Sequence, residues 1–513
     1  MSTYIALTLG PITRVIALAK KTRGMWAASY LFSYLAKHVI EPFKDRQFIL
    51  PYMASNLFNE QSKGVGSFPD RYIFQSQDGD FECLADSVNK TFNVLAANLN
   101  PTDVDGTQKL LMQYFKVYFF ETERKEGLEE RQFVDECERR LALLEHREAF
   151  VPSLADNEHF LSRMFNARNK DMRLMDFLIN DAGNVKFKSI VEITSQDEDN
   201  NSLPDLPYQR YIAIVYADGD SMGKAFAEAA DSSTLSSQLL EFNRKAINTI
   251  NDFDGQPVFI GGDDLFFFAP IYNPGKGSIF SLLQSLDDDF RNALGADNPA
   301  TLSFGVSITY VKYPMSEAVR LSQQLLDGAK GRYVSDAVKP LKNNILFSVQ
   351  KHSGHTRGAL LHKGCVETVK KFNDLADKYI LVKNSEQKDK DKDKDKDEEA
   401  NAVFLRSVMH NLREHEPVLL NAIGDSDLLQ NYFTNNYNEP AHEGYKDFFT
   451  DLQGLLLTAY AEFDGKIDAL KALMPPVDDG VERPKGYDTA YAAIDIAYAL
   501  LQFIHLVNSK RDE

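Results

Sequence analysis

Two aspartate-containing motifs carry the chemistry that this sequence suggests. ADGDSMGK, at residues 217–224, follows the apolar run YIAIVY, and GGDD, at 261–264, lies between the apolar runs PVFI and LFFFA. Asp218 stands where a buried strand should end, and Asp263 and Asp264 stand at the tip of a predicted hairpin. If these strands are neighbours in one sheet, the carboxylates meet at one edge of it.

Carboxylates gathered at one place repel one another unless a cation or shared protons relieve the repulsion. Oxygen ligands with neither His nor Cys nearby favour Mg²⁺ or Mn²⁺, and we expect no zinc. Two such ions, about 4 Å apart, activate an attacking hydroxyl and neutralise a triphosphate leaving group. Glycines in both motifs would allow tight turns and close approach of the backbone to phosphate: Gly219, Gly223, Gly261 and Gly262.

The same motifs have a simpler interpretation. A Gly-Gly-Asp-Asp turn between two apolar runs can be an ordinary hairpin turn without a catalytic role. Only its combination with the ADGD motif at the end of a strand favours an active site. A triphosphate also needs a positive partner, and Lys330 and Lys342 follow the last strand of this region. The alternative for each lysine is a solvated helix end or loop.

The elements that would position these motifs follow in a recognisable order. We expect a strand over 211–217, helical stretches within 224–250, the hairpin around 261–264, a helix over 279–294 and a strand over 301–311. This order is the ferredoxin-like split βαβ pattern, in which we expect the hairpin to supply two central antiparallel strands.

The remainder of the chain divides into regions that differ in apolar pattern and charge. Residues 4–9 suggest a strand, 13–39 an amphipathic helix, 107–150 charged helices and 186–195 a further strand, as in a second α/β domain interrupted by a helical insertion. KDKDKDKDKD, at 388–397, has no apolar residue to bury and indicates a solvated linker. After it, apolar residues at helical spacing predict a bundle.

Composition restricts the classes of function. With 57 Lys and Arg against 75 Asp and Glu, the net charge is −18, which argues against an autonomous nucleic-acid-binding protein. Cys83, Cys137 and Cys365 form no CxxC pair, and we expect buried thiols in a reducing cytosol. No apolar run reaches the 18 or so residues that span a bilayer, so we expect a cytoplasmic protein without a membrane partner.

The residues around both aspartate motifs resemble a known family. YIAIVYADGDSMGK, GGDD, TLSFGVSITYVKYP and KNN together look like the catalytic palm in the large subunit of type III CRISPR effector complexes, a relative of GGDEF-type nucleotide cyclases and polymerase palms. LTLGPITRVIALAKKTRGMWAASYLFSYLA and SFPDRYIF (67–74) resemble the opening of the first palm, which lacks GGDD, in the Cmr-type subunit. The resemblance covers roughly residues 1–75 and 205–355.

This resemblance implies an α+β fold class with two ferredoxin-like palm domains, further helical regions and a C-terminal helical bundle. The expected domains are a first palm-like domain over 1–195 with a helical insertion at about 75–180, a catalytic palm over 205–385, a linker over 386–400 and the bundle over 401–513.

It also implies a function. RNA pairing in the complex would switch on the palm, which joins ATP into cyclic oligoadenylate by 3′–5′ linkage and releases pyrophosphate. The partners would be other type III-B subunits, with guide RNA and target RNA reached through the complex. Asp218 and Asp263 or Asp264 would hold two Mg²⁺ or Mn²⁺ ions, with the Gly219 carbonyl as a further ligand.

The resemblance extends to the nucleotide contacts. Lys330 and Lys342 would face the triphosphates, and the role of Asp220 stays open. The first palm would hold the second nucleotide across a pseudo-twofold interface, around Ala28 and Ser29.

The sequence departs from the family pattern in several places. It has no His-Asp dipeptide, so we expect no HD nuclease, and it lacks the usual four-cysteine zinc module between the palms. Gly24 stands where an acid is expected, which argues against catalysis by the first palm. His352 and His355 are interpreted as structural or surface residues.

Three other functions remain open. The same chemistry would serve an enzyme that joins AMP to S-adenosylmethionine, since the acceptor depends on a pocket that the sequence does not display. A scaffold subunit with a silent palm is the second alternative, against which the intact GGDD weighs. A stand-alone diguanylate cyclase fits least, because it would need neither the first palm nor the bundle.

Overall fold

The structure of the protein is a computed structural model. It describes residues 2–52, 64–66, 68–146, 154–166, 173–183, 187–195, 206–229, 232–295, 297–332, 341–351, 356–380, 394–437, 445–471, 473 and 487–509. His352 and His355, for which a structural or surface role was predicted, lie outside the described residues.

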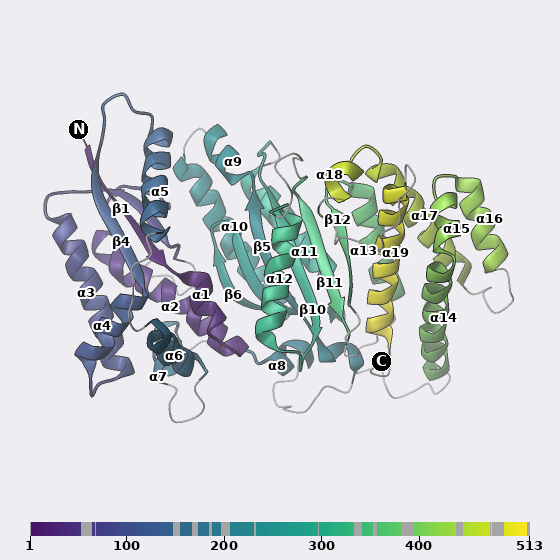
Figure 1. Cartoon of the computed structure of the whole chain (residues 1–513), viewed down its shortest axis with the longest axis horizontal. Coiled ribbons are helices and arrows are strands. Elements are labelled where there is room, and N and C mark those ends of the chain that lie inside the picture. Colours follow the sequence, from purple (N-terminus) through teal and green to yellow (C-terminus); the bar gives the residue numbers. More distant parts are fainter. Residues whose placement is uncertain are drawn as a thin grey trace.

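The first palm domain is built on a four-stranded antiparallel sheet in the order β2-β3-β1-β4. Two helical segments separate the strands along the chain, α1 and α2 before β2 and α3 and α4 before β4 (Figure 1). The order and directions are those of the ferredoxin-like split βαβ fold. The bounds are β1 (Ser2–Gly10), α1 (Ile12–Ala17), α2 (Thr22–Ile40), β2 (Phe48–Leu50), β3 (Arg71–Gln75), α3 (Asp80–Leu99), α4 (Val104–Tyr114) and β4 (Lys116–Arg124).

The second palm domain repeats this topology. Its sheet has the order β12-β11-β10-β5-β7-β6, and the last four strands have the ferredoxin-like order and antiparallel pairing. The bounds are β5 (Tyr211–Asp220), α9 (Met222–Glu228), α10 (Ser232–Asp252), β6 (Gln256–Gly261), β7 (Asp264–Pro270), α11 (Ile279–Leu294), β10 (Thr301–Tyr310), α12 (Met315–Ala329), β11 (Asn344–Gln350) and β12 (Thr356–His362). The predicted fold class is therefore confirmed.

Three details of the prediction are wrong. The hairpin supplies only one central strand, β7, because β6 lies at the sheet edge. The stretch 75–180 is not wholly helical, since it contains β4, which pairs with β1 along its length. Residues 190–195 form the helix α8 (Ile190–Ser195), because Ser189 and Glu192 form a reciprocal capping box: each accepts a hydrogen bond from the other's backbone N–H.

The other helices of the first half are α5 (Glu130–His146), α6 (Leu154–Phe165) and α7 (Arg173–Asp181). The C-terminal half adds α13 (Val366–Tyr379), α14 (Lys394–Glu414), α15 (Glu416–Ala422), α16 (Ser426–Asn436), α17 (Lys446–Phe463), α18 (Ile467–Lys471) and α19 (Tyr487–Asn508). Helices α14 to α19 form the predicted C-terminal helical region, whereas α13 precedes it. The predicted linker over 386–400 is helical from Lys394 onward, and its residues 386–393 lie outside the described part.

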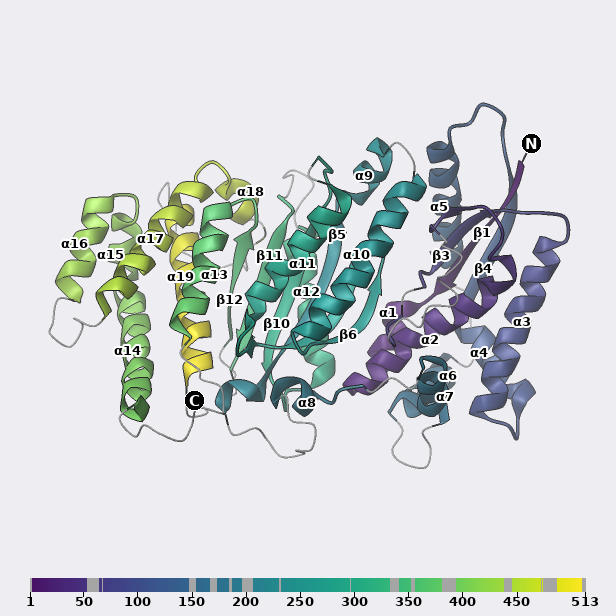
Figure 2. The ribbon, with the colours of Figure 1, turned by 180° about the vertical axis from the view of Figure 1, so that it is seen from behind.

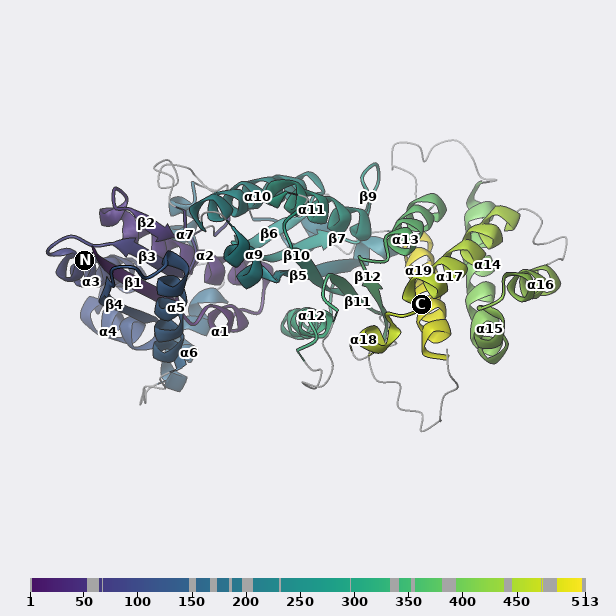
Figure 3. The same cartoon turned by 90° about the horizontal axis from the view of Figure 1, so that it is seen from above.

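The two palms share a hydrophobic core. Successive side chains of β5 point to opposite faces of the sheet: Ala213 and Val215 join the core under α10 and α11, whereas Ile212 and Ile214 join the core of the first palm, which includes α2. Seen from above, α10 and α11 lie on one side of this sheet and α12 on the other (Figure 3). The first palm thus covers part of the second sheet.

The first palm also reaches the edge of the second sheet. A parallel β-bridge joins Gly66 to Phe259 of β6, and α2 contacts the same strand. The backbone N–H of Tyr52 donates to Ser236 Oγ of α10 at 2.7 Å. Figure 2 shows α1 and α2 beside α10 and β6 from behind.

Helix α12 lies unusually close to the sheet. A Cβ atom on Gly305 of β10 would lie 2.2 Å from the backbone nitrogen of Leu326, so only glycine fits there. The Oγ of Ser322, which is fully buried, lies 2.9 Å from the Ile214 carbonyl and 2.8 Å from the Gly305 carbonyl, which share its one O–H donor. These contacts fix the path of α12, which ends beside the carboxylate motif.

Helix α19 corrects the expectation that no segment is apolar enough to span a bilayer. Over Asp488–Asn508 its mean hydropathy is 1.6, which suffices by length and composition, but 83% of this window is buried. It packs against α13, α14, α15, α17 and β12, as a core helix does. Among the cysteines, Cys137 and Cys365 are buried as predicted, whereas Cys83 is exposed.

We predict that Gly305→Ala destabilises the protein by about 3 kcal/mol, because the new methyl group would push the α12 backbone off β10. Urea unfolding of the full chain followed by circular dichroism measures this. The control is Gly454→Ala on α17, where an added Cβ meets only Lys371 Nζ at 3.6 Å and alanine favours the helix. Equal stability of Gly305→Ala and the unaltered protein would contradict the close approach.

Candidate active site at the carboxylate edge of the second sheet

The strand β5 carries two aspartates to the edge of the sheet on the same face. It continues to Asp220, and pairing with β10 sets Asp218 opposite Ser303 and Asp220 opposite Thr301. The side chain of Asp218 is 18% exposed and that of Asp220 only 1% exposed. The two carboxylates therefore occupy different environments, one accessible and one internal.

The hairpin between β6 and β7 brings the second motif to the same edge. Gly261 pairs with Asp264 across a two-residue turn, and Gly262 has φ +65°, a conformation that favours glycine. With its amide oriented to match donors with acceptors, Asn243 of α10 donates to Gly262 O at 2.8 Å and accepts from Gly262 N at 2.9 Å. The turn is thus fixed to a helix.

Asp263 packs directly over Gly219. A Cβ atom on Gly219 would lie 2.5 Å from Asp263 Oδ2, so the glycine is required for the two motifs to meet. Burial and the negative charge of Asp218 raise the pKa of Asp263 to about 6, while backbone hydrogen bonds and Lys330 act in the opposite direction. The predicted convergence of Asp218 and Asp263 is therefore present.

Asp264 is the more exposed member of the turn. Loss of hydration, then the charges of Asp263 and Asp218, raise the pKa of its carboxyl group well above the usual range. The site thus concentrates negative charge.

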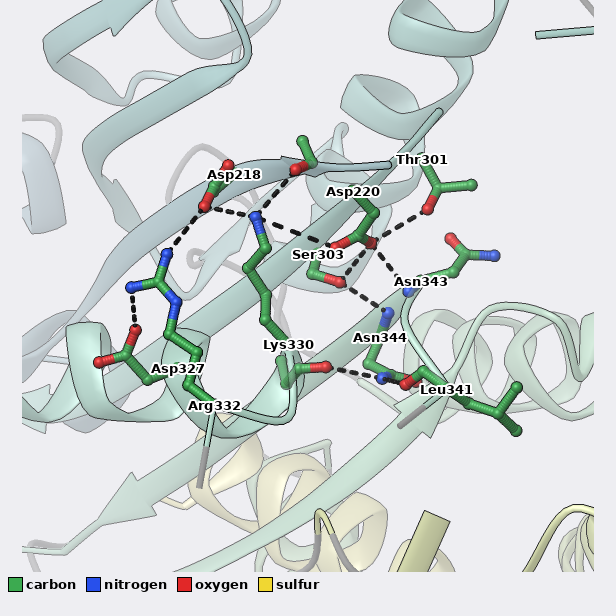
Figure 4. A network of polar contacts seen from close by, with 12 residues as sticks. Asp218, Asp220, Thr301, Ser303, Asp327, Lys330, Arg332, Leu341, Asn343 and Asn344 are labelled. Atoms are coloured by element: carbon green, nitrogen blue, oxygen red, sulfur yellow. Dashed lines mark hydrogen bonds and ion pairs between the residues drawn. The ribbon is translucent and has the colours of Figure 1, made fainter. Parts of the chain in front are cut away.

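Lys330, at the C-terminal end of α12, carries the positive charge of the site (Figure 4). Its ammonium group forms an ion pair with Asp218, donates to the Gly219 carbonyl at 2.8 Å and lies 4.0 Å from Asp220 Oδ1. The lysine side chain is only 9% exposed. It is therefore held by the first motif itself rather than being a solvated helix end, and its predicted contact with a triphosphate stays a prediction.

Arg332 is a second cation that the sequence analysis missed. Its Nη2 lies 3.4 Å from Asp218 Oδ2, and its Nη1 donates to Asp327 at 2.6 Å. The side chain is 58% exposed, so it is free to turn toward a ligand. Its position in the sequence, two residues after Lys330, was the signal that could have identified it.

Asp220 is a positioning residue. Its Oδ2 accepts from Thr301 Oγ1 at 3.0 Å, Ser303 Oγ at 2.7 Å and the backbone N–H of Asn343 at 2.9 Å. Asn343 itself has φ +73°. Through Oδ2, Asp220 thereby joins the start of β10 to the loop before β11, while its Oδ1 lies 4.0 Å from Lys330 Nζ.

Asn344, which the sequence analysis did not single out within KNN, holds the end of α12. It is fully buried, and its Nδ2 donates to Ala329 O at 2.8 Å and to Leu341 O at 2.6 Å. Its Oδ1 lies 2.8 Å from His362 Nδ1. Because Ala329 precedes Lys330, this clamp fixes the backbone from which the lysine reaches the carboxylates (Figure 4).

The other residues that were predicted to bind a nucleotide lie outside the carboxylate network. Gly223, at the start of α9, and Lys342 are exposed, and an added Cβ on Gly223 would meet open space. Ala28 and Ser29 are buried in α2, and Ser29 Oγ, which has no hydrogen-bond partner among the described residues, faces Gly66. Their predicted contact with a nucleotide would require this packing to open.

The donor set fits Mg²⁺ or Mn²⁺ by its chemistry. The predicted ligands are all oxygens, and the carboxylates raise one another's pKa, a repulsion that a divalent cation would relieve. Within the described residues, no group of three or more His, Cys, Asp or Glu side chains is arranged to hold a metal ion. Because Lys330 contacts Asp218 and the Gly219 carbonyl, metal binding would require this lysine to release them.

Comparison with protein families identifies two matched regions. A family model for "Cas10/Cmr2, second palm domain" matches residues 211–339, and one for "CRISPR-associated protein Cmr2, N-terminal" matches residues 4–99. The carboxylate motifs, Lys330 and Arg332 lie inside the first region. Among curated protein sequences, none matches the chain.

Several solved structures are similar in fold. A cryo-EM structure of type III-B Cmr-beta in the apo state has 10% identity and a TM-score of 0.45, with 75% of this chain and 76% of that chain covered. Csm1–Csm4 cassettes crystallised with cA4 and with one ATP each have 11% identity, with 89% of this chain and 69% of theirs covered, and TM-scores of 0.47 and 0.48.

We predict that Asn344→Ala lowers the free energy of unfolding by about 3 kcal/mol, since two buried carbonyls lose their donor. The control Asn421→Ala removes an exposed hydrogen bond to Pro417 O on α15 and should change stability by less than about 0.5 kcal/mol. Urea titration of both variants measures the difference. Equal effects would contradict the role of Asn344 as a clamp.

Proposed function

The chain belongs to the Cas10/Cmr2 family, and we propose that its second palm is an RNA-activated nucleotidyltransferase that joins ATP into cyclic oligoadenylate within a type III CRISPR effector complex. Family membership rests on the N-terminal and second palm models, which match in the same order as the two ferredoxin-like sheets. The proposal adds to this premise the chemistry of the carboxylate edge.

One observation carries the proposal: the Lys330 ammonium is bound at the place where the two aspartate motifs meet. An ammonium that is held by Asp218 and the Gly219 carbonyl has lost much of its hydration and is already oriented. Triphosphate oxygens are strong acceptors for such a donor. Lys330 would therefore exchange a carboxylate partner for a phosphate when ATP binds.

The metal-binding residues would be Asp218, Asp263, Asp264 and the Gly219 carbonyl. When bound there, Mg²⁺ or Mn²⁺ would supply activation of the 3′-hydroxyl and charge neutralisation of the leaving group. The close packing of Asp263 on Gly219 and the anchored turn at Gly262 keep these oxygens in place. Preorganised groups need little rearrangement during the reaction.

The proposed reaction is an in-line displacement at phosphorus. The 3′-oxygen of one ATP attacks the α-phosphorus of another, the bond from that phosphorus to the α–β bridging oxygen breaks, and pyrophosphate leaves with its electron pair. The hydroxyl proton passes to solvent. Lys330 and Arg332 both contact Asp218, next to which the triphosphate would bind. They would therefore neutralise negative charge that develops on the triphosphate.

The proposed partners are other type III-B subunits, which would bring guide RNA and target RNA to the palm. The net charge of −18 supports this arrangement, since bulk charge does not favour RNA on this chain alone. We also propose a cytoplasmic location, which is supported by three cysteines that form no CxxC pair, as suits a reducing compartment.

We predict an RNA-dependent product from the assembled complex with labelled ATP and Mg²⁺ or Mn²⁺. Asp263→Asn should reduce its formation at least about 100-fold, because one metal-binding oxygen is lost. Asp288→Asn is the control, since Asp288 is an exposed aspartate on α11 that bonds only Gln284 among described residues. Chromatography of the products, with and without S-adenosylmethionine, gives the readout.

Each result separates the candidate functions. A cyclic oligoadenylate supports the proposal, whereas a product formed only with S-adenosylmethionine would identify that acceptor instead. No RNA-dependent product under any condition would indicate a silent scaffold. Activity of Asp263→Asn equal to that of Asp288→Asn would reject the assigned site.

We further predict that Lys330→Met reduces kcat/KM for ATP about 100-fold, and Arg332→Gln about fivefold because it is more exposed. The control is Lys245→Met on α10, which removes a more exposed ion pair between Lys245 and Asp289, with an N–O distance of 2.8 Å. Initial rates over a range of ATP concentrations measure all three. A loss no larger for Lys330→Met than for Lys245→Met would contradict the phosphate role.

A further inference from the structure

A cavity of about 760 Å³ lies in the first palm, away from the carboxylate edge. It is lined by the segment after α1, the corner between α3 and α4, and helices α6 and α7. In Figure 1, α6 and α7 lie at the lower border of the molecule, whereas α9, which follows the carboxylate strand, lies at the upper border. The cavity is therefore separate from the proposed active site.

Basic side chains surround this cavity. Among the described residues that line it are Lys20, His159, Arg163 and Arg173, and none of the described lining residues is Asp or Glu. None of these four side chains forms an ion pair with a described residue. By contrast, the nearby Arg14 is paired with Glu158 at 2.6 Å.

Three cationic side chains, Lys20, Arg163 and Arg173, that have no ion pair with a described residue are unexpected around one cavity in a chain of net charge −18. Like charges around one cavity repel one another, and nearby acids would normally relieve the repulsion. A concave site lined by one sign of charge also focuses the electrostatic potential and attracts the opposite ion. The observation points to an anionic ligand.

The cavity wall is held in place by hydrogen bonds. The backbone N–H of Lys20 donates to Asn166 Oδ1 at 2.7 Å, and Asn166 Nδ2 donates to Leu18 O at 3.0 Å. Ser162 Oγ also donates to Leu18 O, at 3.3 Å. Helix α6 is thereby fixed to the segment that carries Lys20, so the backbone of this part of the wall needs little ordering when a ligand binds.

The lining also has an apolar part. Phe160 and Met164 of α6 line the cavity and are partly exposed, and Phe160 lies one helical turn before Arg163. An aromatic ring beside basic groups suits a nucleotide, since the ring stacks on the base while the cations contact phosphate. The volume lies within the range of small-ligand sites, about 300–1,000 Å³.

We propose that this cavity binds the phosphate groups of a nucleotide, either within a single strand of RNA or in a free nucleoside triphosphate. Arg163 and Arg173 supply the main phosphate contacts, Lys20 adds a third, and Phe160 stacks on a base. This site is independent of the proposed reaction, and it gives the acidic chain a direct contact with nucleotides that does not pass through partner subunits.

Binding is measured on the full chain in EDTA, so that metal-dependent binding at the carboxylate edge does not contribute. The probes are a fluorescent single-stranded RNA of about 10 nucleotides, ATP and inorganic phosphate. The double variant Arg163→Gln with Arg173→Gln should weaken binding about tenfold or more. For RNA, the slope of log K against log salt concentration should become shallower by about 1.4. Lys20→Gln should weaken binding less.

The matched control is Arg131→Gln with Arg139→Gln. These arginines are exposed on α5 and have no ion pair with a described residue, so the control makes the same change of charge elsewhere on the first palm. Thermal unfolding checks that every variant is folded.

The preferred probe identifies the source of the phosphate. Tight RNA binding with weak ATP binding indicates that the ligand is a single strand of RNA. Saturable ATP binding that is at least as tight as RNA binding indicates that the ligand is a free nucleotide. The proposal is overturned if no probe binds the unaltered chain, if only inorganic phosphate binds, or if both double variants lose affinity equally.

Discussion

The ion pair between Lys330 and Asp218 is the interaction around which the carboxylate edge of the second sheet is organised. Lysine can reach this position only because α12 lies against β10, which Gly305 allows by presenting no Cβ atom to Leu326. Ser322 then ties the helix to two strands, and Asn344 holds its last carbonyl. The contact between Gly305 and Leu326 thus determines where the Lys330 ammonium lies at the carboxylate edge. A substitution that changes this packing would therefore also move the cation.

The two palms depend on each other for burial of apolar surface. One face of the second sheet packs on α10 and α11, whereas Ile212, Ile214 and Phe268 of the other face belong to the core of the first palm. Exposing those side chains would cost about 1.5–3 kcal/mol each. A first palm without its own GGDD motif therefore has a structural purpose that does not depend on nucleotide binding.

The sequence was informative where one local pattern implies one structure. The run ending at Asp218 and the Gly-Gly-Asp-Asp turn predicted both the sheet edge and the meeting of Asp218 with Asp263. It was less informative where tertiary contacts decide: β4 is a strand because it pairs with β1, and its charged surroundings favoured a helix. The capping box at Ser189 was a missed local signal. The basic cavity could not be predicted, because Lys20 and Arg173 are brought together only by folding.

The bridge between Gly66 and Phe259 has a consequence for solubility. β6 is the edge strand of the second sheet, and an uncovered edge offers unpaired backbone groups to strands of other molecules. At this edge the first palm supplies both the bridge and α2; at the opposite edge, β12 is covered by α19. The second palm expressed alone would expose β6 as a template for intermolecular strand addition, and the N-terminal half of the chain acts as its built-in protection against aggregation.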